Sequence, residues 1–215
     1  MTKQDFLRIG VFYDGTFFAH AQNYFWGKKY GWLQFQQFHQ LLENYVKTKM
    51  QGYSDYKVVY SAWFQGCHKE SLASENNLRL DRKRHIDILH AGIEPKNLPM
   101  SETQGEKGID VFMAIETLQI GLDDKIDIAI LVTGDGDFVP LVRALMKNGI
   151  RVGIAFFEYS DGERKSFANE RLINAANFSL NINNLENDRD FKSAFRAIFR
   201  QPEDNKKTSK LANKI

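Results

Sequence analysis

Residues 126–137 read Ile-Asp-Ile-Ala-Ile-Leu-Val-Thr-Gly-Asp-Gly-Asp, and this stretch decides the fold. Its first seven residues are almost all apolar and many are β-branched, which is typical of a strand buried on both faces of a sheet. The glycines and aspartates of 134–137 predict a tight turn, and the residues after it predict a helix over 138–148 that ends at Asn148-Gly149. A second buried strand is predicted over 150–157. This order indicates two parallel strands joined by a crossover helix.

The same alternation extends in both directions along the chain. Apolar runs predict further strands over 8–13, 58–64, 93–98 (which Pro95 interrupts) and 178–182. Helices are predicted over 33–50, where apolar residues recur at helical spacing, over 109–122, which is apolar, and over 188–200, which is amphipathic. A charged helix is predicted over 69–90 and a further helix over 163–176. The aromatic segment 17–30 is expected to be irregular. Strands that alternate with helices predict an α/β fold with a mainly parallel sheet covered on both faces.

Composition bounds the class of protein. The 215 residues are 43% hydrophobic and 26% charged, which are ordinary globular values and exclude a largely disordered chain. The single cysteine, Cys67, excludes an intrachain disulfide and a thiolate zinc cage, and it indicates a cytoplasmic location. We expect no membrane association, because no apolar run approaches the ~18 residues of a membrane span. The polar N-terminus does not resemble a signal peptide.

The charge is distributed unevenly. Residues 189–215 hold eight basic and three acidic side chains, a net charge of +5, and the remainder of the chain has a net charge of −3. A basic tail on a mildly acidic body fits a nucleic-acid partner, and it equally fits a solvated tail that aids solubility. We therefore predict one domain over residues 1–185, followed by an amphipathic helix and a basic tail over 186–215.

Carboxylates recur where predicted strands end or helices begin. Asp14 follows the first strand, Asp135 and Asp137 follow the strand 126–132, and Glu158 follows the strand 150–157. Asp110 stands at the start of the helix 109–122. Acids gathered at one edge of a parallel sheet repel one another unless a divalent cation neutralises them, and oxygen ligands suit Mg²⁺ or Mn²⁺. The pattern therefore predicts a metal site at this edge.

Each of these acids also has a structural interpretation. Asp137 is a candidate cap for the helix 138–148, Asp110 for its own helix, and Asp14-Gly15 is a candidate turn. Their shared position at matching ends of the elements favours the metal site. Glu116 stays outside it, because six residues after Asp110 it lies about 120° around the helix.

Three motifs carry a resemblance to a known family. They are the strand that ends in Asp14-Gly15, the sequence Lys-Gly-Ile-Asp-Val over 107–111, and the sequence Leu-Val-Thr-Gly-Asp-Gly-Asp-Phe-Val-Pro-Leu-Val over 131–142, with Gly-Ile-Arg-Val over 149–152. In these motifs the chain resembles the NYN domains, within them the LabA-like group, and more widely the PIN-like nuclease superfamily. The resemblance covers residues 6–185, and the block 131–142 is its most specific part.

This resemblance implies a three-layer α/β/α sandwich around a mainly parallel sheet and a Mg²⁺-dependent ribonuclease site. The acids of the family correspond to Asp14, Asp110 and Asp135, which would bind Mg²⁺ or Mn²⁺, with Asp137 beside them. The first motif departs from the family, because Phe17 occupies the position of a common Asn.

We therefore predict a metal-dependent ribonuclease that hydrolyses phosphodiester bonds in single-stranded RNA. Asp14, Asp110, Asp135 and Asp137 are its catalytic candidates, and Lys107 and Thr133 are candidates to orient phosphate or water. The alternative is an RNA-binding or regulatory module without turnover, which Phe17 favours. A phosphatase of the haloacid dehalogenase type is excluded, because its nucleophilic Asp would stand two residues before Asp14, where the chain has Phe12.

Two other features allow more than one interpretation. The helix 69–90 contains Arg79, Arg82, Lys83, Arg84 and His85, which line either an RNA path or a solvated face. The aromatic residues of 17–30 either stack on bases or pack inside the protein, and a contact in a homodimer is a third option.

Overall fold

The computed structural model describes residues 6–67, 74–100, 107–162 and 165–200. Its centre is a six-stranded sheet in the order β4-β3-β1-β5-β6-β9, with every neighbouring pair parallel. The strands are β1 (Phe6–Asp14), β3 (Asp55–Cys67), β4 (Glu94–Pro99), β5 (Ile128–Val132), β6 (Arg151–Phe156) and β9 (Phe178–Asn181). The predicted α/β/α sandwich with a parallel sheet is confirmed.

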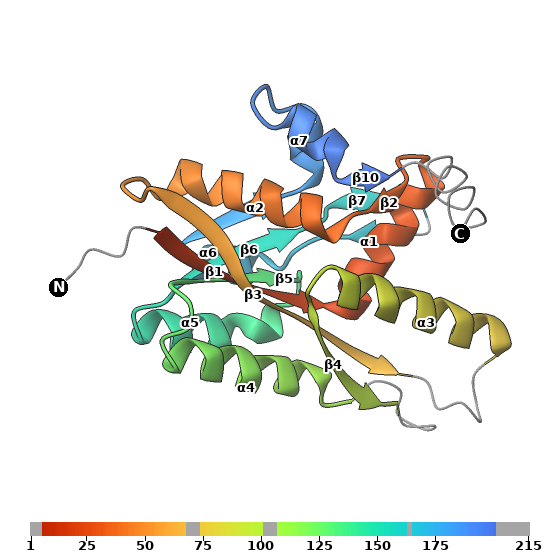
Figure 1. Cartoon of the computed structure of the whole chain (residues 1–215), viewed down its shortest axis with the longest axis horizontal. Coiled ribbons are helices and arrows are strands. Elements are labelled where there is room, and N and C mark those ends of the chain that lie inside the picture. The colour runs from red at the N-terminus through yellow and green to blue at the C-terminus, as the bar shows by residue number, and fades with distance from the viewer. Residues whose placement is uncertain (1–5, 68–73, 101–106, 163–164, 201–215) are drawn as a thin grey trace, which may run out of the picture.

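Helices cover both faces of this sheet (Figure 1). One face is covered by α1 (Gly15–Gly27), α2 (Phe35–Lys49) and α7 (Lys192–Ala197), with α3 (Glu75–His90) at its margin. The other face is covered by α4 (Ile109–Leu122), α5 (Val139–Lys147) and α6 (Glu170–Ala175). Among the described helices, none combines the length and the apolar character needed to cross a bilayer.

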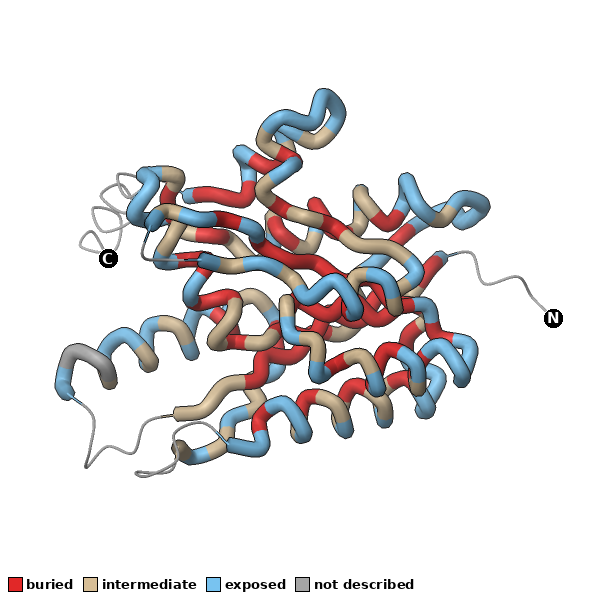
Figure 2. The backbone as a smooth tube through the Cα atoms, turned by 180° about the vertical axis from the view of Figure 1, so that it is seen from behind, coloured by how far each residue is buried: buried red, intermediate tan, exposed pale blue. Residues whose placement is uncertain are grey.

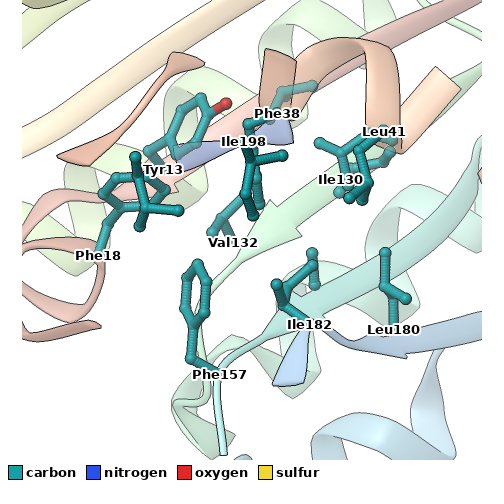
Figure 3. Close-up of a cluster of buried hydrophobic side chains, with 14 of the residues drawn as sticks. Tyr13, Phe18, Phe38, Leu41, Ile130, Val132, Phe157, Leu180, Ile182 and Ile198 are labelled. Atoms are coloured by element: carbon teal, nitrogen blue, oxygen red, sulfur yellow. The ribbon is translucent and has the colours of Figure 1, made fainter. Parts of the chain in front are cut away.

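Two hydrophobic clusters fill the spaces between the layers. The cluster under α1 and α2 is rich in aromatic rings, and Figure 3 shows Tyr13, Phe18, Phe38 and Phe157 among its members. The second cluster joins β5 and β6 to α4 and α5 through aliphatic side chains such as Leu131. In Figure 2 the buried residues run through the strands, while the outer faces of the helices are exposed. The sheet is therefore buried on both sides, as the run 126–132 predicts.

The segment 17–30 corrects our expectation of an irregular structure. It lies mostly in α1, whose N-cap is Asp14. Phe18, Gln22 and Phe25 are buried at helical spacing, so the helix is stabilised by packing rather than by propensity. Aromatic residues have low helix propensity, which hid this helix in the sequence. Because Phe18 and Phe25 belong to the core, these two rings pack inside the protein and do not stack on bases.

Two predicted helices are shorter than expected. The helix predicted over 163–176 begins only at Glu170, because Asn169 caps it, and residues before it pair as β7 (Tyr159–Ser160) and β8 (Lys165–Ser166). The helix predicted over 188–200 is reduced to α7, and the short strand β10 (Phe199–Arg200) follows it. The 3₁₀ turn η2 (Asn183–Glu186) lies before the predicted range.

The C-terminal segment packs on the rest of the chain. β10 pairs antiparallel with β2 (Trp32–Leu33), and Phe195 and Ile198 are buried in the aromatic-rich cluster. The predicted tail after Pro202 and the predicted start of the helix 69–90 lie outside the described residues. The division of the chain at residue 185 stays a prediction.

The remaining elements agree with the sequence to within a few residues. The helix predicted over 109–122 is α4 with the same bounds, and the turn 134–137 contains the 3₁₀ turn η1 (Gly136–Phe138). The strand 93–98 exists as β4 in spite of Pro95, because β4 is an edge strand and the missing N–H costs no ladder bond there.

Candidate functional site

The order of the strands places a switch point between β1 and β5. From β1 the chain moves outward to β3 and β4, then crosses back to β5 and continues outward to β6 and β9. In open parallel sheets, ligands bind beyond the carboxyl ends of the strands at such a point. Asp14 is the last residue of β1, and Thr133 directly follows β5. The edge predicted from the sequence is therefore the edge that the topology favours.

Asp14 is held by two donors. Its Oδ1 accepts a hydrogen bond from the backbone N–H of Phe17 at 3.0 Å, which caps α1. Its Oδ2 accepts one from the hydroxyl of Thr133 at 3.1 Å. Asp14 is thus a helix cap and a candidate ligand at the same time, and the cap fixes the direction of its carboxylate.

Thr133 joins the two strand ends. It is fully buried, and its Oγ1 both donates to Asp14 and accepts from the backbone N–H of Asp135 at 3.2 Å. The same hydroxyl therefore fixes the carboxylate after β1 and the loop after β5. Because this hydroxyl is buried and engaged, it positions neighbouring groups from within the protein.

Asp135 and Asp137 lie in the exposed loop after β5. The Oδ1 of Asp135 accepts a hydrogen bond from the N–H of Asp137 at 2.9 Å and caps η1. Both side chains are exposed, and neither forms an ion pair with a residue that the structure describes. Their negative charge is available to a ligand.

The topology of the fold places Asp110 at the same carboxyl edge of the sheet. Since α4 follows the carboxyl end of β4 and crosses back toward β5, it begins where the strands end. Gly108 has a φ of +79° and makes the turn before the helix, Asp110 lies in the first helical turn, and Lys107 precedes it. Asp110 and Lys107 are both exposed.

The oxygen donors at this edge suit a hard divalent cation in their chemistry. In the described ranges, however, no group of three or more His, Cys, Asp or Glu side chains is arranged to hold a metal ion. The structure links Asp14 to the loop of Asp135, and the centre of three carboxylates stays a prediction.

Phe17 packs where the family motif commonly has Asn. Its ring lies 6.0 Å from the ring of Phe157, and a Cβ added at Gly134 would come within 3.1 Å of it. The side chain therefore fills space beside the loop after β5. It offers no polar atom to a ligand there.

Asn169 is a residue at this edge that our sequence analysis missed. Its backbone N–H donates to the carbonyl of Gly134 at 2.8 Å, and its side chain caps α6. A Cβ added at Gly136 would lie 2.6 Å from its amide nitrogen, so Gly136 is required for this close approach. An Asn directly before Glu170 is a helix-start signal, but its contact with the loop after β5 is long-range and leaves no local pattern.

A basic groove begins beside the same loop. It runs between α5 and α6 from Gly136, and Arg143, Lys147 and Arg171 line it. All three cations are exposed. The groove therefore offers positive charge directly beside the exposed carboxylates.

Comparisons with known proteins agree with this architecture. The sequence model of the NYN domain matches residues 8–183. No curated protein matches the chain. The crystal structure of a protein of unknown function from Vibrio parahaemolyticus is similar, with a TM-score of 0.56 and 21% sequence identity, over 89% of this chain and 99% of that one. At this identity the likeness supports the fold alone.

Proposed function

The chain belongs to the NYN domain family, and on this premise we propose that it is a ribonuclease that hydrolyses phosphodiester bonds in single-stranded RNA. The observation that carries the proposal is the pair of carboxylates at the switch point. Asp14 ends one of the two strands that flank it and Asp135 lies in the loop after the other, and the buried hydroxyl of Thr133 donates to the carboxylate of Asp14 and accepts from the backbone N–H of Asp135. We also propose that the chain belongs to the LabA-like group, on the block 131–142.

The proposed cofactor is Mg²⁺ or Mn²⁺, held by Asp14, Asp110 and Asp135, with Asp137 beside them. Such an ion supplies an activated water and stabilises the charge of the phosphodiester in the transition state. The protein's own part is to hold the carboxylates in position. Thr133 does so from within the core, and the cap on α1 keeps the carboxylate of Asp14 directed by two hydrogen bonds.

The basic groove supports a polyanionic substrate. Arg143 and Arg171 line the groove together with Gly136, and Gly136 stands between Asp135 and Asp137 in the sequence. Guanidinium groups bind phosphate through parallel hydrogen bonds and offset its repulsion from nearby carboxylates. Lys107, exposed beside the start of α4, is a second candidate to bind phosphate.

A non-catalytic RNA-binding module is the second candidate function. The observation that favours it is Phe17, which fills its position with an apolar ring packed beside Gly134. The two candidates share the fold and the basic groove and differ in turnover. A cytoplasmic location and a homodimer stay predictions from the sequence.

The experiment is cleavage of a labelled single-stranded RNA by the purified chain, with Mg²⁺, with Mn²⁺ and with EDTA. We expect metal-dependent cleavage that Asp135→Asn abolishes. Asp124→Asn is the matched control, because it removes the same charge at the opposite end of the sheet, and Asn tolerates the positive φ of 55° found there. RNA binding without cleavage in any metal would favour the second candidate, and hydrolysis of small phosphate esters alone would contradict both.

A further inference from the structure

A cavity lies on the face of the sheet that α1 and α2 cover, whereas the basic groove between α5 and α6 lies on the other face. Residues of α1, of the first turn of α2 and of α3 line it, and its volume is about 280 Å³. Pockets for small ligands are commonly about 300–1,000 Å³, so this cavity suits a ligand of one nucleotide unit rather than a strand.

Aromatic rings form the apolar wall of the cavity. Trp32 comes from β2, Trp63 from β3, and Phe18 and Phe35 from the two helices. Trp32 is partly exposed, and its ring lies 5.0 Å from that of Trp26. Phe18 and Trp63 are buried, so among these rings only the partly exposed Trp32 and Phe35 offer surface against which a base can pack.

Cations line the same cavity beside Trp32. The Nζ of Lys83 lies 4.8 Å from the centre of the Trp32 ring, and Arg84 is its neighbour on α3. Arg200 lines the cavity from β10, where it pairs with Trp32. Asp87 is the one carboxylate among the described lining residues, so positive charge exceeds negative charge.

Arg84 differs from the other basic residues of α3, because it is partly buried. Its guanidinium contacts the Oε1 of Gln65 at 3.3 Å and the carboxylate of Asp81 at 3.7 Å, a long ion pair. Burial lowers the pKa of Arg84, and the charge of Asp81 offsets that effect in part. Arg79, by contrast, is exposed and lines no described cavity. A partly buried cation whose ion pair is long gains from a further anion.

The start of α2 adds to the preference for an anion. Residues 34–37 line the cavity, and Gln34 makes no capping hydrogen bond with its side chain. The first turn of this 15-residue helix has no acidic residue. Free N–H groups at the start of a helix bind phosphate well.

We propose that this cavity binds a phosphorylated nucleoside, with the base beside the partly exposed rings of Trp32 and Phe35 and the phosphate at Lys83 and Arg84. The ligand is either a free mononucleotide or one unit of an RNA strand. The second source rests on the proposed ribonuclease function. It is supported by Trp63, whose indole packs so closely on Gly15 that an added Cβ would lie 2.5 Å from its nitrogen. The wall of the cavity thus continues to the turn that holds Asp14.

The test measures binding in EDTA, where no metal-dependent cleavage occurs. All three tryptophans of the chain line the cavity or contact its wall, so their fluorescence reports occupancy. The probes are 5′-AMP, inorganic phosphate and a labelled single-stranded RNA of ten nucleotides. We expect Arg84→Gln and Lys83→Gln each to weaken binding about tenfold, since each removes a charge-assisted contact with the phosphate. Arg79→Gln, which removes the same charge from the same helix, should leave binding within about twofold.

Each outcome of this experiment either supports or refutes the proposed nucleotide site. Weakening by the two cavity variants and not by Arg79→Gln supports the site, with 5′-AMP identifying a free nucleotide and the RNA alone identifying a strand. The site is refuted by equal effects of all three variants, by phosphate binding as tightly as 5′-AMP, or by binding of neither nucleotide probe. Lys83 is exposed, so its variant remains informative if the replacement of Arg84 destabilises the fold. RNA binding that persists without cleavage in Mg²⁺ would overturn the proposed function and leave this site standing.

Discussion

Carboxylates at the amino ends of β1 and β5 have different partners from the carboxylates at the carboxyl ends of the same strands. At the amino end, the guanidinium of Arg8 donates to both carboxylate oxygens of Asp127, at 3.1 and 2.8 Å, and the backbone N–H of Arg8 donates at 2.8 Å. At the carboxyl end, Asp14 and Asp135 accept from N–H and O–H groups, and Asp135 has no ion pair within the described chain. The carboxylate at the amino end is paired with a cation, whereas the candidate carboxylates at the carboxyl end are held by neutral donors, which is the arrangement that the proposed ligand-binding role requires.

The largest effect is expected at the amino end. Asp127→Ala leaves Arg8, whose side chain is 16% exposed, without its main partner, so we expect a loss of about 3–4 kcal/mol in the free energy of unfolding. The hydrogen bonds of Arg8 hold the pKa of Asp127 below its usual value although burial raises it, so the stabilisation is present above about pH 3.8 and is lost as pH falls below that. Urea unfolding at pH 7 measures the loss.

Asp124→Asn is the control for this pair, because Asn tolerates the positive φ of 55° at this position. Asp124 also contacts Arg8, but its side chain is 92% exposed, so the cost should stay below about 1 kcal/mol. Equal losses for the two variants would show that burial does not separate a structural ion pair from a surface one here.

A second prediction concerns a loss of stability at acid pH that comes from a buried histidine and not from a carboxylate. Burial lowers the pKa of His39 from 6.5 to about 4, and its Nε2 has no hydrogen-bond partner in the described structure. Because the unfolded chain binds the proton first, stability should fall by about 3 kcal/mol as pH drops from above 6.5 to 4. His39→Phe, which keeps the packing of the ring, should flatten the profile in that window. An unchanged profile in urea unfolding at pH 7.5 and 4 would assign the acid sensitivity to other groups.

The third effect concerns the hydroxyl that joins the two strand ends. Thr133→Val keeps the shape and removes both hydrogen bonds of Oγ1, which should cost about 1–2 kcal/mol. Thr133→Ser keeps the hydroxyl and loses one buried methyl, about 1 kcal/mol. The two variants should therefore melt at similar temperatures, while RNA cleavage in Mg²⁺ survives in Thr133→Ser and is strongly reduced in Thr133→Val. Equal cleavage activity of the two variants would show that the Thr133 hydroxyl does not position the candidate carboxylates.

The sequence predicts the residues at the carboxyl ends of β1 and β5 better than it predicts the elements packed around them. Asp14 and Asp135 were found because buried strands have a clear pattern and their ends meet at one edge. α1 was missed because packing of Phe18 and Phe25 outweighs their low propensity. The contact of Asn169 with Gly136 and the burial of Arg84 depend on how distant elements pack, which no local pattern records.

The most direct test of the central claim is a thermal melt of the wild type and of Asp135→Asn, each in EDTA and in Mg²⁺. Asn still caps η1, so the comparison isolates the charge. We predict that in EDTA the variant melts at the same temperature as the wild type or higher, because a repulsion among the carboxylates is removed. Mg²⁺ at ten times its Kd should stabilise the wild type by about 1.4 kcal/mol, or roughly 3–6 °C, and the variant much less. A variant that melts lower in EDTA, with no shift of either protein by Mg²⁺, would contradict a ligand-binding role for these carboxylates.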